Sequence, residues 1–192
     1  MAAINLTKST GKINLKKEFP GLKRVRLDLE WTDANIDADA SAFVCDGNSK
    51  LLSNEHFVFY GLDPDQNGLK ADPQKAVVYG GDSRKGGVET IKIDLEKVAS
   101  AAAEIALVIT IYESKEKNKH FGNLTAGGIS LYNDETGDLL ASFKFGTGEY
   151  TNESLIHMAS LFKGANGWEF EAFGRGAANK DLGDALEMFG AQ

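Results

Sequence analysis

The sequence predicts a mainly all-β fold of two packed antiparallel sheets, a β-sandwich, with a few short helices that include one at the C-terminus. Three observations support this prediction. About ten short segments of strand character follow one another closely, turn residues separate them, and strands do not alternate regularly with helices as a parallel sheet would require. The 192 residues fit one domain, residues 1–192, because a single β-sandwich can use a chain of this length.

The clearest strand lies in the first quarter of the chain. Arg24–Trp31 alternates apolar with charged residues, so one of its faces is predicted to be buried. Residues 4–15 alternate more weakly and predict two short strands around a turn at residues 9–11. Further strands are predicted at residues 42–45, 57–60, 77–79 and 91–95, with an Asp-Gly-Asn turn after the first of them.

The middle of the chain combines a predicted helical turn with a central strand. Residues 96–103 contain an alanine cluster, which favours a helical turn. Residues 105–112 form a short, nearly continuous apolar run rich in β-branched side chains, which is typical of a central strand covered on both faces. Residues 113–119 are polar and predict a loop.

Two hairpins and a helix are predicted for the last third. Residues 129–132 pair with residues 139–145 across an acidic turn, and residues 155–162 pair with residues 168–173 across an Asn-Gly turn. Residues 181–189 predict a short helix with apolar side chains on one face.

Composition excludes several classes of protein. The formal net charge of −7 and the pI of about 5.0 disfavour nucleic acid as a partner, because phosphate backbones would be repelled. Cys45 is the only cysteine, which excludes an intrachain disulfide and a multi-cysteine zinc site and favours a reducing compartment. Neither a secretory signal nor a membrane segment is recognisable, so we expect a cytoplasmic protein.

Carboxylates are the best candidates for a functional site. Asp37 and Asp39 are two residues apart, so in an extended segment their side chains share a face. With Asp82 and Glu89 they are predicted in loops at strand ends, which can gather at one edge of a sandwich. Oxygen ligands of this kind suit Ca²⁺. Two alternatives remain. In the first, the acids only keep the start of a strand solvated. In the second, a carboxylate pair serves as general acid and general base, which requires a cleft.

Other catalytic chemistry has little support in the sequence. His56, His120 and His157 lack the spacing of a zinc site and are interpreted as structural. Cys45 falls on a predicted core strand and is interpreted as a small buried hydrophobe. The glycine-rich segment at residues 80–87 lacks the residue order of a phosphate-binding loop.

A series of motifs along nearly the whole chain resembles one family. The motifs are Ile-Asp-Ala-Asp-Ala-Ser-Ala-Phe at residues 36–43, Phe-Val-Phe-Tyr at 57–60, Gly-Asp-Ser at 81–83, Phe-Gly-Asn at 121–123, Leu-Tyr-Asn-Asp-Glu-Thr-Gly at 131–137 and Trp-Glu-Phe-Glu-Ala-Phe-Gly-Arg-Gly at 168–176. In this order they resemble the TerD family of tellurium-resistance and general stress proteins.

The resemblance implies a non-enzymatic, calcium-binding β-sandwich of bacteria, tied to resistance to tellurite, other chemical stress and phage. It implies partners among other proteins of the tellurium-resistance and stress system, in complexes of which some lie near the membrane. The calcium-associated aspartate pair of the family corresponds to Asp37 and Asp39, its Gly-Asp-Asn motif to residues 81–83 with Asp82, and the glutamate that closes its acidic loop to Glu89.

The chain departs from the family pattern in the loop between Asp82 and Glu89. This loop is shorter than is usual in the family and carries two cations, Arg84 and Lys85, which predicts weak calcium binding. Three hypotheses follow: a weakly calcium-binding stress protein that acts through protein contacts, a metal-free paralogue that serves as an interaction module in the same system, and an enzyme that uses the same carboxylates.

Overall fold

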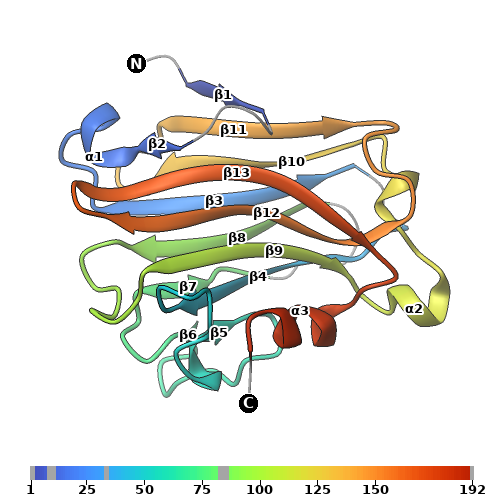
Figure 1. Cartoon of the computed structure of the whole chain (residues 1–192), viewed down its shortest axis with the longest axis horizontal. Helices are drawn as coiled ribbons and strands as arrows, with labels where there is room; N and C mark the ends of the chain where they lie inside the picture. The colour runs from blue at the N-terminus through green and yellow to red at the C-terminus, as the bar shows by residue number, and fades with distance from the viewer. Residues whose placement is uncertain (1–2, 8–11, 33–34, 82–86, 191–192) are drawn as a thin grey trace.

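The computed structural model describes residues 3–7, 12–32, 35–81 and 87–190 and shows two β-sheets packed face to face (Figure 1). The first sheet has the strand order β1 (Ile4–Leu6), β11 (Leu139–Gly146), β10 (Ala126–Asn133), β3 (Arg24–Trp31), β8 (Gly87–Asp94), β7 (Val77–Tyr79) and β6 (Lys70–Ala71). The second has the order β2 (Ile13–Asn14), β13 (Gly167–Ala178), β12 (Glu153–Gly164), β9 (Glu104–Ile111), β4 (Ala38–Cys45) and β5 (Phe57–Val58).

The predicted two-sheet sandwich is confirmed, with one parallel pair that the sequence did not predict. Strand β1 runs parallel to β11, with Ile4 beside Ala141. The pair β12 and β13 forms the predicted second hairpin and continues with β9 and β4, all antiparallel. The first sheet is therefore mixed and the second antiparallel.

Strand β9 lies in the centre of the second sheet and is buried on both faces, as its continuous apolar run predicts. Ile105, Leu107 and Ile109 face the first sheet in the main core. Ala106 and Val108 face the opposite side, which we call the outer face of the second sheet, and they belong to a separate apolar cluster there. Alternation of side chains along the strand produces this division.

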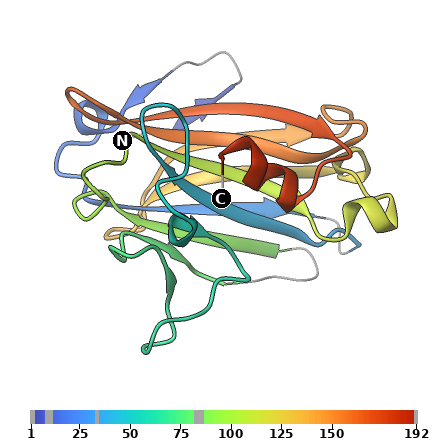
Figure 2. The same cartoon turned by 60° about the horizontal axis from the view of Figure 1, so that its bottom comes forward.

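Helix α3 (Leu182–Met188) covers part of the outer face of the second sheet (Figure 2). Asp181 begins the helix with a capping box, in which its side chain accepts from the Asp184 N–H. Lys115 Nζ lies 2.7 Å from carboxylate oxygens of both Asp181 and Asp184. At the other end Leu51 N–H donates to the Phe189 carbonyl at 2.8 Å. The helix is thus held at both ends, by Lys115 and by Leu51.

The prediction of a helical turn at residues 96–103 is wrong. The segment forms successive turns instead, with Lys97 N–H donating to Asp94 O at 3.1 Å and Ala102 N–H to Ala99 O at 3.0 Å. It has to connect the ends of β8 and β9, which lie in different sheets. This tertiary requirement overrides the helix propensity of its alanines.

Other differences concern the limits of elements. Strand β4 begins at Ala38, four positions before the predicted start at residue 42, and the predicted loop at residues 113–119 contains the short helix α2 (Ser114–Lys117). The turn predicted at residues 9–11 lies outside the described residues. The remaining short helices are α1 (Leu15–Glu18), η1 (Asn54–His56) and η2 (Phe121–Asn123).

Candidate functional site

The predicted aspartate pair lies at the start of strand β4. Asp37 directly precedes the strand, and its carbonyl accepts from Tyr112 N–H at 2.9 Å. Asp39 lies within the strand, rather than in the predicted loop, and is only 5% exposed. Because Ala38 and Ala40 face the main core, alternation places Asp39 on the outer face of the second sheet.

Glu89 reaches the same strand from the other sheet. It lies within β8, opposite Leu29 of β3, and is 0% exposed. Its Oε2 accepts a hydrogen bond from Ala40 N–H at 2.6 Å. Strand β5 pairs with β4 at Ala42 and Phe43, beyond this position. The Glu89 carboxylate therefore binds a backbone donor of β4 where β5 does not pair with it.

Ser41 is a candidate that the sequence interpretation missed. It is 1% exposed and shares its face of β4 with Asp39. Its hydroxyl oxygen forms no hydrogen bond to the residues that the structure describes. A buried polar atom without a protein partner is uncommon, so the Ser41 hydroxyl is available to bind a ligand. The spacing Asp-x-Asp-x-Ser was the available signal.

The described carboxylates do not form a complete metal site by themselves. Asp82 lies outside the described residues, and within residues 3–7, 12–32, 35–81 and 87–190 no group of three or more His, Cys, Asp or Glu side chains is arranged to hold a metal ion. Asp39, Glu89 and Ser41 supply the hard oxygens that Ca²⁺ prefers, but the ion needs about six to eight. The donor set fits calcium in its chemistry and is incomplete in number.

A second buried polar group lies on the outer face of the second sheet, at the first residue of β9. Glu104 is 4% exposed and accepts from Ser49 Oγ at 2.5 Å and from Ser160 Oγ at 2.6 Å. Ser160 Oγ lies 2.9 Å from His157 Nε2. Because Ser160 donates its proton to Glu104, His157 donates to Ser160 through Nε2. We call these four residues the Glu104 network.

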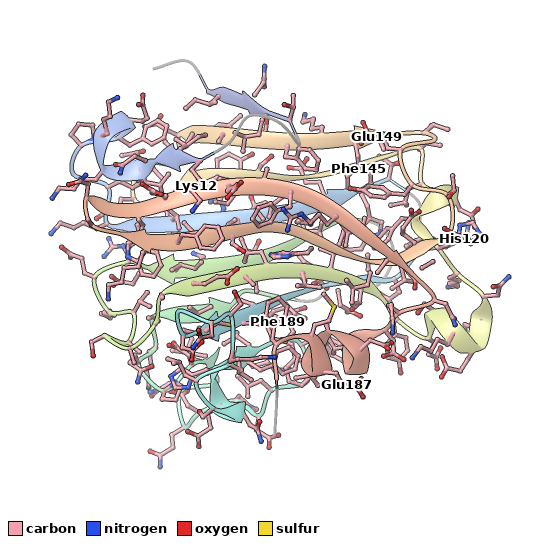
Figure 3. All side chains as sticks on the ribbon, in the orientation of Figure 1. Lys12, His120, Phe145, Glu149, Glu187 and Phe189 are labelled. Atoms are coloured by element: carbon pink, nitrogen blue, oxygen red, sulfur yellow. The ribbon has the colours of Figure 1, made fainter. Side chains whose placement is uncertain are left out.

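Two of the three histidines, His56 and His157, have neighbours that explain their structural roles. His157 packs against Phe173 and Phe189, with ring centroids at 4.9 and 5.8 Å. Phe189 directly follows α3 (Figure 3). His56 lies 2.8 Å from Ser53 Oγ and 3.1 Å from Gln74 Oε1 through its two ring nitrogens. Both rings are held by hydrogen bonds to uncharged side chains, as the structural interpretation requires.

His157 makes the stability of the fold depend on pH. Burial lowers its pKa from 6.5 to about 4. Between pH 6.5 and about pH 4 the unfolded chain binds a proton at His157 that the folded protein does not. The stabilisation by neutral His157 is therefore complete above pH 6.5 and is lost as the pH falls to about 4. The expected loss is at most about 3 kcal/mol. Urea unfolding at both ends of the window should show it, and His157→Gln should reduce it; an unchanged pH dependence in that variant would contradict the assignment.

Cys45 is unsuited to thiol chemistry. It is 0% exposed and its Sγ donates weakly to Phe43 O at 3.5 Å. Burial raises the pKa of its thiol to about 12, so the nucleophilic thiolate is scarce at neutral pH. The prediction of a small buried hydrophobe is confirmed.

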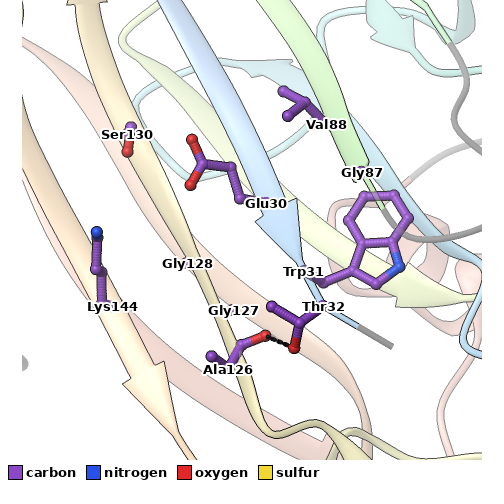
Figure 4. A pocket seen from close by; sticks show the side chains of 10 residues that line it. All are labelled: Glu30, Trp31, Thr32, Gly87, Val88, Ala126, Gly127, Gly128, Ser130 and Lys144. Carbon is purple, nitrogen blue, oxygen red and sulfur yellow. Dashed lines mark hydrogen bonds between the residues drawn. The ribbon is translucent and has the colours of Figure 1, made fainter. Parts of the chain in front are cut away.

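Two hollows among the described residues lie away from the aspartate pair. One, of about 400 Å³, lies on the first sheet and includes Glu30, Gly128 and Lys144 in its lining (Figure 4). The other, of about 510 Å³, is lined by the turn at residues 19–22 and by residues 133–140. Asp37, Asp39 and Glu89 line neither, so these hollows do not provide the cleft that the enzyme hypothesis needs.

No helix in the described part of the chain is long and apolar enough to cross a membrane.

Comparison with known proteins gives consistent matches over almost the whole chain. A family model described as the TerD domain matches residues 1–189. "Tellurium resistance protein TerD" of Serratia marcescens is 30% identical over 185 residues, 92% of each chain. "General stress protein 16U" of Bacillus subtilis (strain 168) is 29% identical over 176 residues, 86% of each chain.

Among solved structures, a homologue of telluride resistance protein (TerD) from Streptomyces coelicolor A3(2) has the same fold. Its TM-score is 0.66 at 20% identity, and the match covers 90% of this chain and 100% of that chain.

Proposed function

This chain belongs to the TerD family, whose members include tellurium-resistance and general stress proteins, and we propose that it is a non-enzymatic stress protein that binds Ca²⁺ and acts through contacts with other proteins. Asp37, Asp39, Asp82 and Glu89 are the proposed ligands, with Ser41 as an additional oxygen donor. The proposed partners are other proteins of the tellurium-resistance and stress system, in the cytoplasm or in a complex near the membrane.

The observation that carries the calcium proposal is the set of buried oxygens along β4. Asp39 is 5% exposed and Ser41, two residues further on the same face, is 1% exposed without a hydrogen-bond partner among the described residues. Glu89, also buried, contacts the backbone between them. Carboxylate and hydroxyl oxygens are the ligands that Ca²⁺ prefers. A bound Ca²⁺ would join Asp39, Ser41 and Glu89 and would order this end of the sandwich.

The proposal that the protein is not an enzyme has separate support. The aspartate pair lines neither of the two hollows described above, and the Cys45 thiol is buried and protonated at neutral pH. Ser160 donates its proton to Glu104 and is 0% exposed, so it is not placed as a nucleophile. Direct reduction of tellurite by Cys45 is therefore disfavoured as well.

Calorimetric titration of chelator-treated protein with calcium, with magnesium as the control, tests the proposal. We expect saturable binding of calcium at micromolar to millimolar concentration, because the donor set is sparse. Asp39→Asn should abolish the binding and Ser41→Ala should weaken it, while Glu171→Gln on another part of the same sheet should leave it unchanged. Absence of binding heat and of thermal stabilisation at millimolar calcium would contradict the proposal that the protein binds calcium.

One observation favours the metal-free alternative. Glu89 Oε2 already accepts a backbone hydrogen bond that links the two sheets, so Glu89 has a structural role without any metal. Under this alternative the protein is an interaction module of the same stress system. The double variant Asp37→Asn, Asp39→Asn would then keep binding to its partner proteins in pull-down experiments, with or without calcium, whereas a calcium-dependent module would lose it.

A further inference from the structure

The hollow of about 400 Å³ lies on the face of the first sheet that is turned away from the second sheet (Figure 4). Four strands contribute one residue each to a row across its floor. The pairing register places Val88 of β8 opposite Glu30 of β3, Glu30 opposite Gly128 of β10, and Gly128 opposite Lys144 of β11. A glycine thus separates a carboxylate from an ammonium group.

The glycine creates the hollow and cannot easily be replaced. A Cβ atom at Gly128 would lie 2.6 Å from the Phe143 carbonyl oxygen, which is closer than such atoms approach. The position between Glu30 and Lys144 therefore has no side chain. Neighbouring strands are about 4.8 Å apart, so the Cα atoms of the two charged residues are separated by roughly 9.6 Å across the gap.

The charges that border the hollow differ from others on the same face. Asp28 accepts from Arg26 Nε at 3.0 Å and from Thr90 Oγ1 at 3.0 Å, and Lys92 lies 3.3 Å from Asp134. By contrast, neither Glu30 nor Lys144 has an ion-pair partner among the described residues. Glu30 on β3 and Lys144 on β11 flank Gly128 of β10 (Figure 4). Two opposite charges face a space large enough for a small molecule.

We propose that this hollow binds a small zwitterion of the amino-acid class, with its ammonium group on Glu30 and its carboxylate on Lys144. Both charged groups of such a ligand are needed, because the ammonium group pairs with the Glu30 carboxylate and the ligand carboxylate pairs with the Lys144 ammonium group. The Val88 side chain, 48% exposed at the edge of the row, gives the carbon atoms of the ligand an apolar contact. The proposal does not depend on calcium, because none of the proposed calcium ligands lines the hollow.

Titration with L-leucine, followed by amide chemical shifts, tests the proposal. The Gly127 and Gly128 signals should shift saturably, since both residues line the hollow. Two analogues with a single charge, 3-methylbutylamine and 4-methylpentanoate, should bind about fivefold more weakly, which corresponds to about 1 kcal/mol for one half-exposed charge pair. The result should be the same in calcium and in chelator, which separates it from the calcium proposal.

Matched variants locate the site. Glu30→Gln and Lys144→Gln should each weaken binding of L-leucine about fivefold, and the double exchange Glu30→Lys, Lys144→Glu should restore it with the ligand reversed. Lys92→Gln on the same face, outside the hollow, should have no effect. Absence of saturable shifts, equal binding of the singly charged analogues, or unchanged binding in both single variants would each overturn the proposal.

Discussion

Replacement of Phe43 by alanine is expected to lower the free energy of unfolding by about 3 to 5 kcal/mol. Phe43 is 0% exposed on the outer face of the second sheet. Its ring stacks on Phe57 at 4.7 Å and on Phe189, beyond α3, at 4.5 Å. Removal of the ring would leave a cavity beneath the helix, because both neighbours are held by other elements. Urea unfolding followed by fluorescence measures the loss.

Met188→Ala provides the matched control for Phe43→Ala. Met188 also belongs to the region of α3 but is 51% exposed, so its replacement should change stability by no more than about 0.5 kcal/mol. If Phe43→Ala cost less than about 1 kcal/mol with an unchanged dependence on urea, α3 would not be closely packed on this sheet.

Glu104→Ala is expected to cost about 2 to 4 kcal/mol, because the carboxylate is the common acceptor of two buried hydroxyl groups. Ser49 and Ser160 both donate to it, at 2.5 and 2.6 Å. In the variant Ser160 retains only His157 as a partner. His157 then accepts through Nε2 instead of donating, so its ring proton moves to Nδ1. Nitrogen chemical shifts of His157 report this change of tautomer.

Glu104→Gln separates the loss of charge from the loss of the acceptor. The amide oxygen keeps one hydroxyl partner, so this variant should lose less stability than Glu104→Ala, and the His157 tautomer should be retained. Equal losses in the two variants, with no change at His157, would show that the Glu104 network is not connected as described.

The periodicity of the sequence was sufficient to predict the strands that carry the core. In β3 the alternation of apolar and charged residues predicted the buried face, and in β9 the continuous apolar run predicted burial on both sides. The failed helix at residues 96–103 shows the limit of local propensity. Its alanines favour helix, but the connection between β8 and β9 decides the conformation, and that constraint is not local.

The candidate site was predictable only where it depends on local spacing. The two-residue separation of Asp37 and Asp39 predicted a shared face, and the same rule adds Ser41. The contact of Glu89 with Ala40 joins residues 49 positions apart, and Ser160 and Glu104 are separated by 56 positions. Such contacts depend on strand order and sheet packing, which local patterns do not encode.

The most direct test of the calcium proposal follows the amide proton of Ala40 during addition of calcium to chelator-treated protein, with magnesium as the control. This proton is donated to Glu89 Oε2 at 2.6 Å, next to Asp39. If calcium binds Glu89 and Asp39, the Ala40 signal should shift saturably, and Asp39→Asn should abolish the shift. An Ala40 signal that stays unchanged to millimolar calcium would contradict calcium binding at this site and would leave the metal-free interaction module as the function to test.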